Sequence, residues 1–113
     1  MRALPLDAKA VASLDKVLHE PARLSLVACL SLVEEADFVF LQSQTGMTGG
    51  NLSSHVRKLE QAQYIGIRKE FQGTRPRTIL QLTDVGRQAL ETYLNLMRSL
   101  LAVMDQATAE PPS

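Results

Sequence analysis

A short stretch in the middle of the sequence combines small polar side chains with two basic ones. It contains Thr48, Gly50, Asn51, Ser53, Ser54, His55, Arg57 and Lys58. Asparagine can pair bidentately with adenine and arginine with guanine, whereas a serine hydroxyl suits a base or a phosphate. These residue types predict contact with double-stranded DNA, in which Asn51, Ser54 and His55 face bases. Arg57 and Lys58 would then lie mainly on phosphates.

The basic residues of the chain are concentrated in one region. The 113 residues include 12 basic and 12 acidic ones, so the formal net charge is zero. Residues 51–80 hold six of the basic residues and two of the acidic ones, which gives this window a charge of +4 and the remainder −4. Such a patch attracts a polyanion locally. Arg75 and Arg77 flank Pro76 within it, and we expect them at a hairpin tip that enters a minor groove.

Helical spacing places the polar stretch on one side of a helix. Thr48 is a good N-cap, because its hydroxyl can accept a hydrogen bond from an amide near Asn51. Leu52, Val56 and Leu59 follow at positions i, i+4 and i+7 and form one apolar stripe toward the core. The polar side chains lie largely off that stripe, where an α-helix can present them to a major groove.

The remaining elements follow from apolar spacing and turn residues. In chain order, the predicted elements are helices at residues 7–18, 21–33 and 38–44 (stopped by Gly46), a helix from Thr48, strands at 64–71 and 78–82, and a helix at 84–105 capped by Thr83. We expect a loop at 34–37, a hairpin turn at 72–77 and a frayed tail at 106–113. This order predicts one domain over 1–113 of the mainly α (α+β) class, a winged helix-turn-helix in which residues 7–83 form the helices and the two-stranded wing.

The last helix carries an apolar arc that is too wide for a single contact. We expect one side to cover the domain's own core and the other to meet a second copy of the chain. The candidate dimer-interface residues are Val11, Leu14, Leu18, Leu90, Leu94, Met97, Leu101 and Met104. A two-fold homodimer sets the two recognition helices, the helix from Thr48 in each copy, about 34 Å apart, which is one turn of B-DNA. Such a dimer implies a pseudopalindromic operator. A monomer whose last helix only covers the core is the alternative.

Three segments resemble winged-helix transcriptional regulators of the MarR/ArsR-like group. They are Pro-Ala-Arg-Leu at residues 21–24, Met-Thr-Gly-Gly-Asn-Leu-Ser-Ser-His-Val-Arg-Lys-Leu-Glu at 47–60, and Leu-Thr-Asp-Val-Gly-Arg at 82–87. The resemblance spans about residues 14–93. It implies a dimeric regulator that binds operator DNA, and we expect a repressor.

Two positions depart from the usual pattern of that group. Such proteins usually carry glycine where this chain has Gln63, and a left-handed residue there costs roughly 1 kcal/mol more with glutamine than with glycine. We therefore expect a different local turn, which should affect stability more than recognition. Gly49 and Gly50 lie in the first turn of the recognition helix, where glycine lets the backbone approach a phosphate and the helix N-terminus favours anions. A helix start with a soft first turn is the alternative explanation.

The sequence lacks the residues that several classes of function need. Cys29 is the single cysteine, which excludes an internal disulfide and suits a reducing compartment, so we expect a cytoplasmic protein. His19 and His55 lie far apart in the sequence, so we expect no metal site. We also expect no cofactor and no catalysis, because neither a phosphate-loop ending nor a catalytic pair is present. No apolar run approaches the roughly 20 residues that cross a bilayer. Whether a small molecule regulates the protein stays an open question, since no group of residues indicates a binding site for one.

A winged helix used only for protein–protein contact is the competing interpretation, because one fold can serve unrelated functions. A protein-binding version would more often be neutral or apolar on the helix that here carries Asn51, Ser54 and Arg57. The polar and basic helix therefore favours DNA as the partner.

Overall fold

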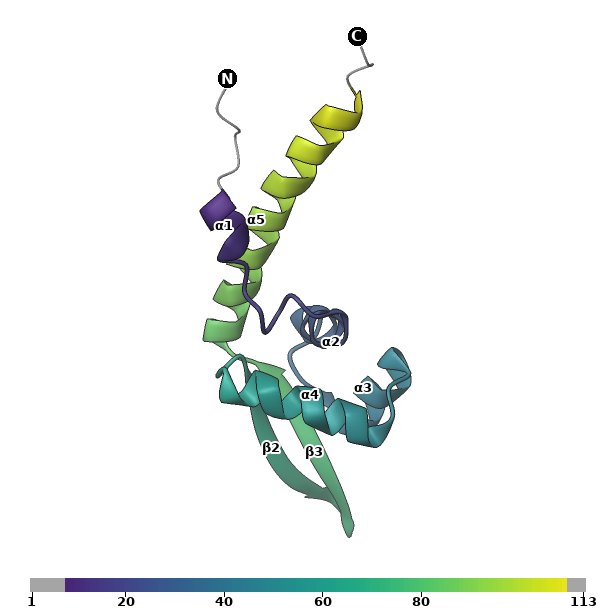
Figure 1. Ribbon diagram of the computed structural model, residues 1–113. Helices are drawn as coiled ribbons and strands as arrows, with labels where there is room; N and C mark the ends of the chain where they lie inside the picture. The colour runs from purple at the N-terminus through teal and green to yellow at the C-terminus, as the bar shows by residue number, and fades with distance from the viewer. Residues whose placement is uncertain (1–7, 110–113) are drawn as a thin grey trace.

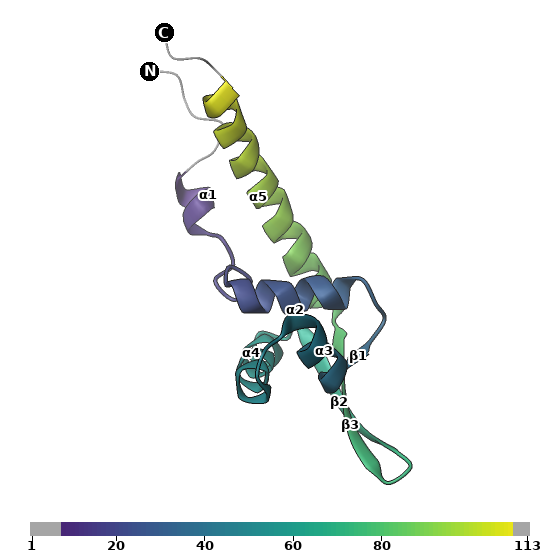
Figure 2. The same ribbon diagram turned by 90° about the vertical axis from the view of Figure 1, so that its right-hand side faces the viewer.

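The computed structural model describes residues 8–109, which form five helices around a small antiparallel sheet (Figure 1). In chain order the elements are α1 (Ala8–Ala12), α2 (Pro21–Ser31), β1 (Ala36–Asp37), α3 (Phe38–Thr45), α4 (Gly49–Gln61), β2 (Ile65–Gln72), β3 (Arg75–Leu82) and α5 (Asp84–Ala109). The strand order is β1–β3–β2. The β2–β3 hairpin projects from one end of the body formed by α2, α3 and α4, and α5 rises from the other (Figures 1 and 2). The predicted α+β class, with its two-stranded wing and long last helix, is confirmed.

The core lies between the helices and the sheet. It consists mainly of buried aliphatic side chains: Leu18, Leu26, Val27, Leu30, Leu41, Leu52, Val56, Leu59, Ile65, Leu80 and Leu82. The predicted stripe on α4 is confirmed, because Leu52, Val56 and Leu59 are all buried. Fully burying one such side chain contributes roughly 1.5–3 kcal/mol. The stripe therefore determines which side of α4 faces inward and which side faces solvent.

The hairpin turns in fewer residues than the sequence predicts. A two-residue turn, Gly73–Thr74, joins β2 to β3. Its glycine has φ 66°, as at the first position of type II′ turns. Pro76 lies in β3 opposite Phe71, and in antiparallel strands every second pair needs no N–H donor, so proline is tolerated. The turn expected at 72–77 is wrong, and Arg75 and Arg77 are strand residues.

A third strand forms where the sequence predicts a loop. Ala36 and Asp37 pair antiparallel with Leu80 and Ile79, so the expected loop at 34–37 is only partly present. A two-residue strand is too short to show the alternation by which strands are predicted. The pairing also sets Asp37 at the start of α3, where its carboxylate accepts a hydrogen bond from a backbone N–H.

The first helix is shorter than predicted. It ends at Ala12, and residue 7 lies outside the described residues. Oδ1 of Asp15 accepts hydrogen bonds from the backbone N–H groups of Val17 and Leu18 at 2.8 and 3.2 Å. An aspartate that bonds the backbone two residues on stabilises a turn in competition with a helix. The placement of Leu18 in a dimer interface is wrong, because this side chain is fully buried in the domain's own core.

Helix α5 is longer than predicted and only partly covered. It continues to Ala109, so the tail expected to fray from residue 106 is helical through residue 109, and residues 110–113 lie outside the described part. The N-terminal half of α5 packs on the core, whereas Leu101 and Met104 have exposures of 51% and 55%. The second half of the helix therefore presents apolar side chains to solvent.

The junction between α4 and β2 keeps a left-handed residue although the chain has no glycine there, so the different local turn expected at Gln63 is wrong. Gln63 has φ 65°, and within residues 8–109 no other non-glycine residue has a positive φ. Its carbonyl accepts a hydrogen bond from Oγ1 of Thr83 at 2.7 Å. The same Oγ1 accepts one from the N–H of Gly86 at 2.9 Å, which confirms Thr83 as the cap of α5.

We expect Gln63→Gly to raise the free energy of unfolding by about 1 kcal/mol, because glycine has no Cβ to strain a left-handed backbone. Chemical denaturation measures the gain. Ala62→Gly is the matched control: this residue has an ordinary φ of −77°, and glycine there should destabilise by about 0.5–1 kcal/mol. A Gln63→Gly variant no more stable than the wild type would contradict the expectation.

Candidate nucleic-acid interface

Helix α4 presents polar side chains on the side away from the core. The predicted cap is confirmed, because Oγ1 of Thr48 accepts a hydrogen bond from the N–H of Asn51 at 3.2 Å. The exposed candidate residues at and after this cap are Thr48, Gly50, Asn51, Ser53, Ser54, Arg57 and Lys58. Among the described residues, the side chains of Asn51, Ser53, Ser54, Arg57 and Lys58 form no hydrogen bond or ion pair, so their polar groups are available to a ligand.

His55 lies differently from the other candidates on α4. Its side chain is only 23% exposed, and its Nδ1 lies 3.3 Å from Nη1 of Arg23 and 3.7 Å from Oε2 of Glu20. This position holds the middle of α4 against the start of α2. It does not support the expectation that His55 faces bases.

Arg23 connects α4 to the segment before α2. Its Nε donates to the carbonyl of Val17 at 2.7 Å, and its side chain is only 11% exposed. Glu20, the N-cap of α2, accepts a hydrogen bond from the N–H of Arg23 at 2.8 Å. Partial burial raises the pKa of Glu20, but the hydrogen bonds from backbone N–H groups outweigh it and leave the pKa below its ordinary value. Arg23 is therefore a structural residue and is not free to contact a phosphate.

Two of the basic residues in the +4 window are already paired with carboxylates. Arg68 lies 3.2 Å from Glu35 and 3.1 Å from Glu70. Arg77 lies 3.0 Å from Asp37 and 3.9 Å from Glu70. The placement of Arg77 at the hairpin tip is wrong, because its guanidinium reaches back to the start of α3. These two arginines add much less to the basic patch than their sequence positions suggest.

A groove of about 540 Å³ lies between α4 and the hairpin. Its polar lining includes Ser53 and Arg57 from α4, Lys69 and Thr78 from the hairpin, and the carboxylate of Glu60. Lys69 forms no ion pair among residues 8–109 and was missing from the predicted site. Strand alternation predicts that Arg68 and Lys69 point to opposite faces, but only the packing shows which face meets α4.

The carboxylate of Asp37 is held in its charged form at the start of α3. The N–H of Phe40 donates to it at 2.7 Å and Arg77 donates at 3.0 Å, and these contacts hold the pKa of Asp37 below its ordinary value of 3.8. A carboxyl whose pKa is lower in the folded than in the unfolded state stabilises the fold above the unfolded value. That stability is lost as the pH falls through the folded pKa.

We expect Asp37→Asn to lower the free energy of unfolding by roughly 0.5–1 kcal/mol at pH 7, because asparagine keeps the cap but loses the pair with Arg77. The difference from the wild type should shrink below about pH 4 and vanish where Asp37 is protonated. Denaturation of both proteins between pH 7 and pH 2 checks this. A difference that does not depend on pH would contradict the role of the charge.

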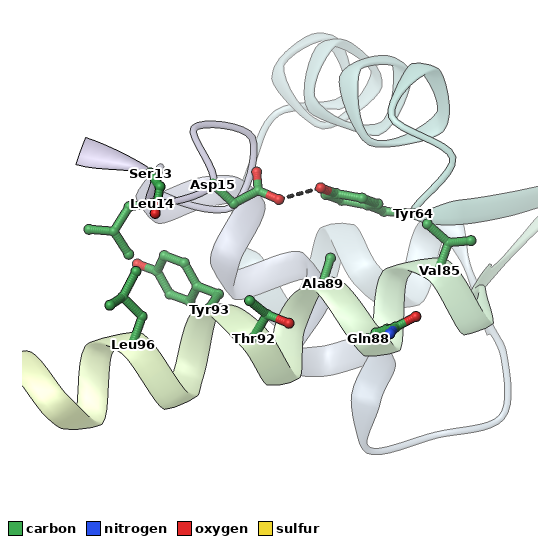
Figure 3. Close-up of a pocket in the computed structure, with 10 residues that line it drawn as sticks. All are labelled: Ser13, Leu14, Asp15, Tyr64, Val85, Gln88, Ala89, Thr92, Tyr93 and Leu96. Atoms are coloured by element: carbon green, nitrogen blue, oxygen red, sulfur yellow. Dashed lines mark hydrogen bonds between the residues drawn. The ribbon is translucent and has the colours of Figure 1, made fainter. Parts of the chain in front are cut away.

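A second groove, of about 440 Å³, lies between the segment after α1 and helix α5 (Figure 3). Tyr64 donates a hydrogen bond from its hydroxyl to the carboxylate of Asp15, across the groove from α5. Burial and this bond raise the pKa of Tyr64 to about 12. The hydroxyl of Tyr93 lies 2.9 Å from Nδ1 of His19. These contacts attach the segment after α1 to the rest of the domain, and the groove has the size of a small-molecule pocket.

Within residues 8–109, no group of three or more His, Cys, Asp or Glu side chains is placed to hold a metal ion. In that range no helix combines the length and the apolar character that a membrane span requires.

A polar helix that lies exposed beside a projecting, partly basic hairpin defines the winged-helix class of protein. Residues 22–101 match the family of the winged helix DNA-binding domain, and the chain belongs to that family.

Proteins from other organisms are similar to this chain in sequence or in fold. An uncharacterized protein of Methanocaldococcus jannaschii is 30% identical over 79 residues, which cover 70% of this chain and 86% of that protein. The structure of a transcriptional regulator homologue from Pyrococcus horikoshii OT3 is 32% identical, with a TM-score of 0.71 over 88% of this chain and 97% of that one. A MarR family transcriptional regulator from Silicibacter pomeroyi has the same fold at 19% identity, with a TM-score of 0.55 over 93% of this chain and 68% of that one.

Proposed function

We propose that the protein binds operator DNA as a homodimer and represses transcription by occupying the operator. The observation that carries this proposal is the outer face of α4, where polar and basic side chains are exposed and have no partner among the described residues. Buried or ion-paired side chains would have to give up existing contacts before they could bind DNA. The side chains on the outer face of α4 can bind DNA without losing any such contact.

The proposed DNA-binding surface, formed by α4 and the neighbouring hairpin, makes two kinds of contact. Asn51 and Ser54 lie near the N-terminal half of the helix and have the hydrogen-bonding groups that distinguish base edges. Arg57, Lys58 and Lys69 are suited to phosphates, because they are cations without a carboxylate partner among residues 8–109. Membership of the winged helix DNA-binding family supports this assignment.

The apolar second half of α5 supports the dimer. Leu101 and Met104 are exposed in the single chain, and Leu100 and Val103 beside them are only half-buried. Burying such a stripe against the same stripe of a second copy removes apolar surface from water on both chains. Helix α1 packs against α5 at the same end of the molecule, so Val11 and Leu14 would lie beside that contact.

Selection of DNA fragments from a random 30-base-pair library tests the proposal. We expect enrichment of a pseudopalindromic motif whose half-sites are one helical turn apart. Asn51→Ala should change the preferred base at one position of each half-site, where a bidentate contact discriminates by about 1–3 kcal/mol. Lys58→Ala should weaken binding to all sequences and reduce the slope of log affinity against log salt by about 0.9 for each lost phosphate contact.

Arg98→Ala is the matched control, because this exposed arginine lies on α5, away from α4 and the hairpin. It removes one positive charge and should leave the salt slope unchanged. If no motif is enriched and affinity for duplex DNA is the same for the wild type and Lys58→Ala, the DNA-binding proposal fails. A winged helix that contacts only proteins would then be favoured.

A further inference from the structure

The end of the hairpin carries an unusual exposed aromatic residue. Phe71 has an exposure of 74% and lies two positions before the turn of the hairpin. Its partner across the strands is Pro76. The register therefore sets two apolar residues opposite each other next to the turn. The turn is the part of the hairpin that projects farthest from the body (Figures 1 and 2).

The pairing register decides which face of the hairpin these two residues occupy. Ile67 pairs with Leu80, the pair of Lys69 with Thr78 comes next, and then that of Phe71 with Pro76. Since every second residue of a strand shares a face, the three pairs lie on one face of the hairpin. That face packs on the core at Leu80 and lines the groove beside α4 at Lys69. Phe71 and Pro76 extend the same face beyond the groove.

The charges around this apolar pair are positive and available. Lys69 on the same face and Arg75 beside the turn form no ion pair among residues 8–109, whereas Arg68 and Arg77 of the opposite face are paired with carboxylates. The apolar pair thus lies between an unpaired cation on its own face, Lys69, and one on the opposite face, Arg75, and its face continues into the groove beside α4. A polyanion that also has apolar surface fits this arrangement.

We propose that Phe71 and Pro76 form an apolar edge that packs into the minor groove of the duplex bound by α4. The walls of a minor groove are formed by deoxyribose, and apolar side chains that enter it contact these walls and wedge against base steps. Lys69 and Arg75 hold the phosphates on either side. This inference rests on the proposed function, and it assigns the hairpin a contact that does not depend on charge.

Salt dependence separates the apolar contact from the ionic ones. The probe is a 30-base-pair duplex enriched by the wild-type protein. We expect Phe71→Ala to weaken binding about tenfold at every salt concentration, without changing the slope of log affinity against log salt. Lys69→Ala should instead reduce that slope by about 0.9. Phe71→Leu should recover most of the affinity, because it retains an apolar side chain, and hydroxyl-radical protection of the minor groove should be lost only in Phe71→Ala.

Leu32→Ala is the matched control, since Leu32 is 85% exposed at the C-terminal end of α2 and should not contact the duplex. Equal affinities of Phe71→Ala and the wild type for the enriched duplex would overturn this inference and leave the proposed function intact. A change in oligomeric state in Phe71→Ala, without a change in DNA affinity for each dimer, would also overturn it and indicate contact between copies. If the wild type enriches no duplex, both proposals fail.

Discussion

Gly86→Ala is expected to lower the free energy of unfolding by about 3 kcal/mol or more. A Cβ at residue 86 would lie 2.1 Å from the carbonyl oxygen of Tyr64 and 2.8 Å from Cδ1 of Leu82. The oxygen cannot move away without a further loss, because it accepts a hydrogen bond from the N–H of Thr83 at 3.0 Å. The start of α5 would have to shift away from the end of the α4–β2 junction, and Leu82 would lose its place in the core.

Gly50→Ala is the matched control for this effect. Gly50 also lies within a helix, but a Cβ there meets nothing within 4 Å. Alanine should therefore stabilise α4 by about 0.5–1 kcal/mol, its ordinary advantage over glycine in a helix. Denaturant titrations of both variants measure the two changes. If Gly86→Ala unfolds at the same denaturant concentration as the wild type, the close approach at Tyr64 is wrong.

Replacing Leu101 and Met104 together by glutamate is expected to give a monomer that binds the operator about 100-fold more weakly or worse. Both residues are exposed in the single chain, so the change should leave the domain folded. In the proposed dimer they are buried against the partner, where two unpaired carboxylates on each chain are costly. A monomer holds one half-site at a time, and the loss of linkage between two half-sites costs about 10²–10⁴ in affinity.

Ser99→Glu combined with Gln106→Glu is the matched control. These two residues are exposed and lie on the side of α5 away from the apolar arc, so they add the same charge outside the proposed interface. Sedimentation at micromolar concentration and duplex titration should give a dimer and near wild-type affinity for this control. If the Leu101 and Met104 variant also remains a dimer, a different surface forms the contact.

The winged helix and most of the α4 face could be predicted from the sequence because local spacing encodes them. Leu52 and Val56 indicate the buried side of α4, and the exposed side follows without any knowledge of the rest of the chain. Thr48 and Thr83 mark the starts of two helices, because each hydroxyl accepts a hydrogen bond from the amide three residues later. The left-handed backbone at Gln63 was not predicted, because a glutamine in place of glycine indicated a different turn.

Other parts of the site depended on contacts between distant segments. The sequence places Arg77 and Arg75 in one basic turn, yet Arg77 is paired with Asp37, a residue 40 positions away, while Arg75 has no ion pair in the described chain. His55 likewise matches the spacing of a base-contacting residue, but it lies against Arg23 and Glu20 of another helix. No local sequence pattern predicts such contacts, because each depends on how two elements pack together.

The sequence by itself therefore determined the class of fold and the polar, exposed side of α4, since 3.6-residue and two-residue periods act over a few neighbouring positions. Only the tertiary structure decided which cations are free, which hairpin face joins α4, and why residue 86 must be glycine. Those features are set by distances between side chains and backbone atoms far apart in the chain. The neutral charge of the whole chain consequently conceals a surface in which Arg68 and Arg77 are paired with carboxylates, whereas Lys69 is exposed and has no ion pair among residues 8–109.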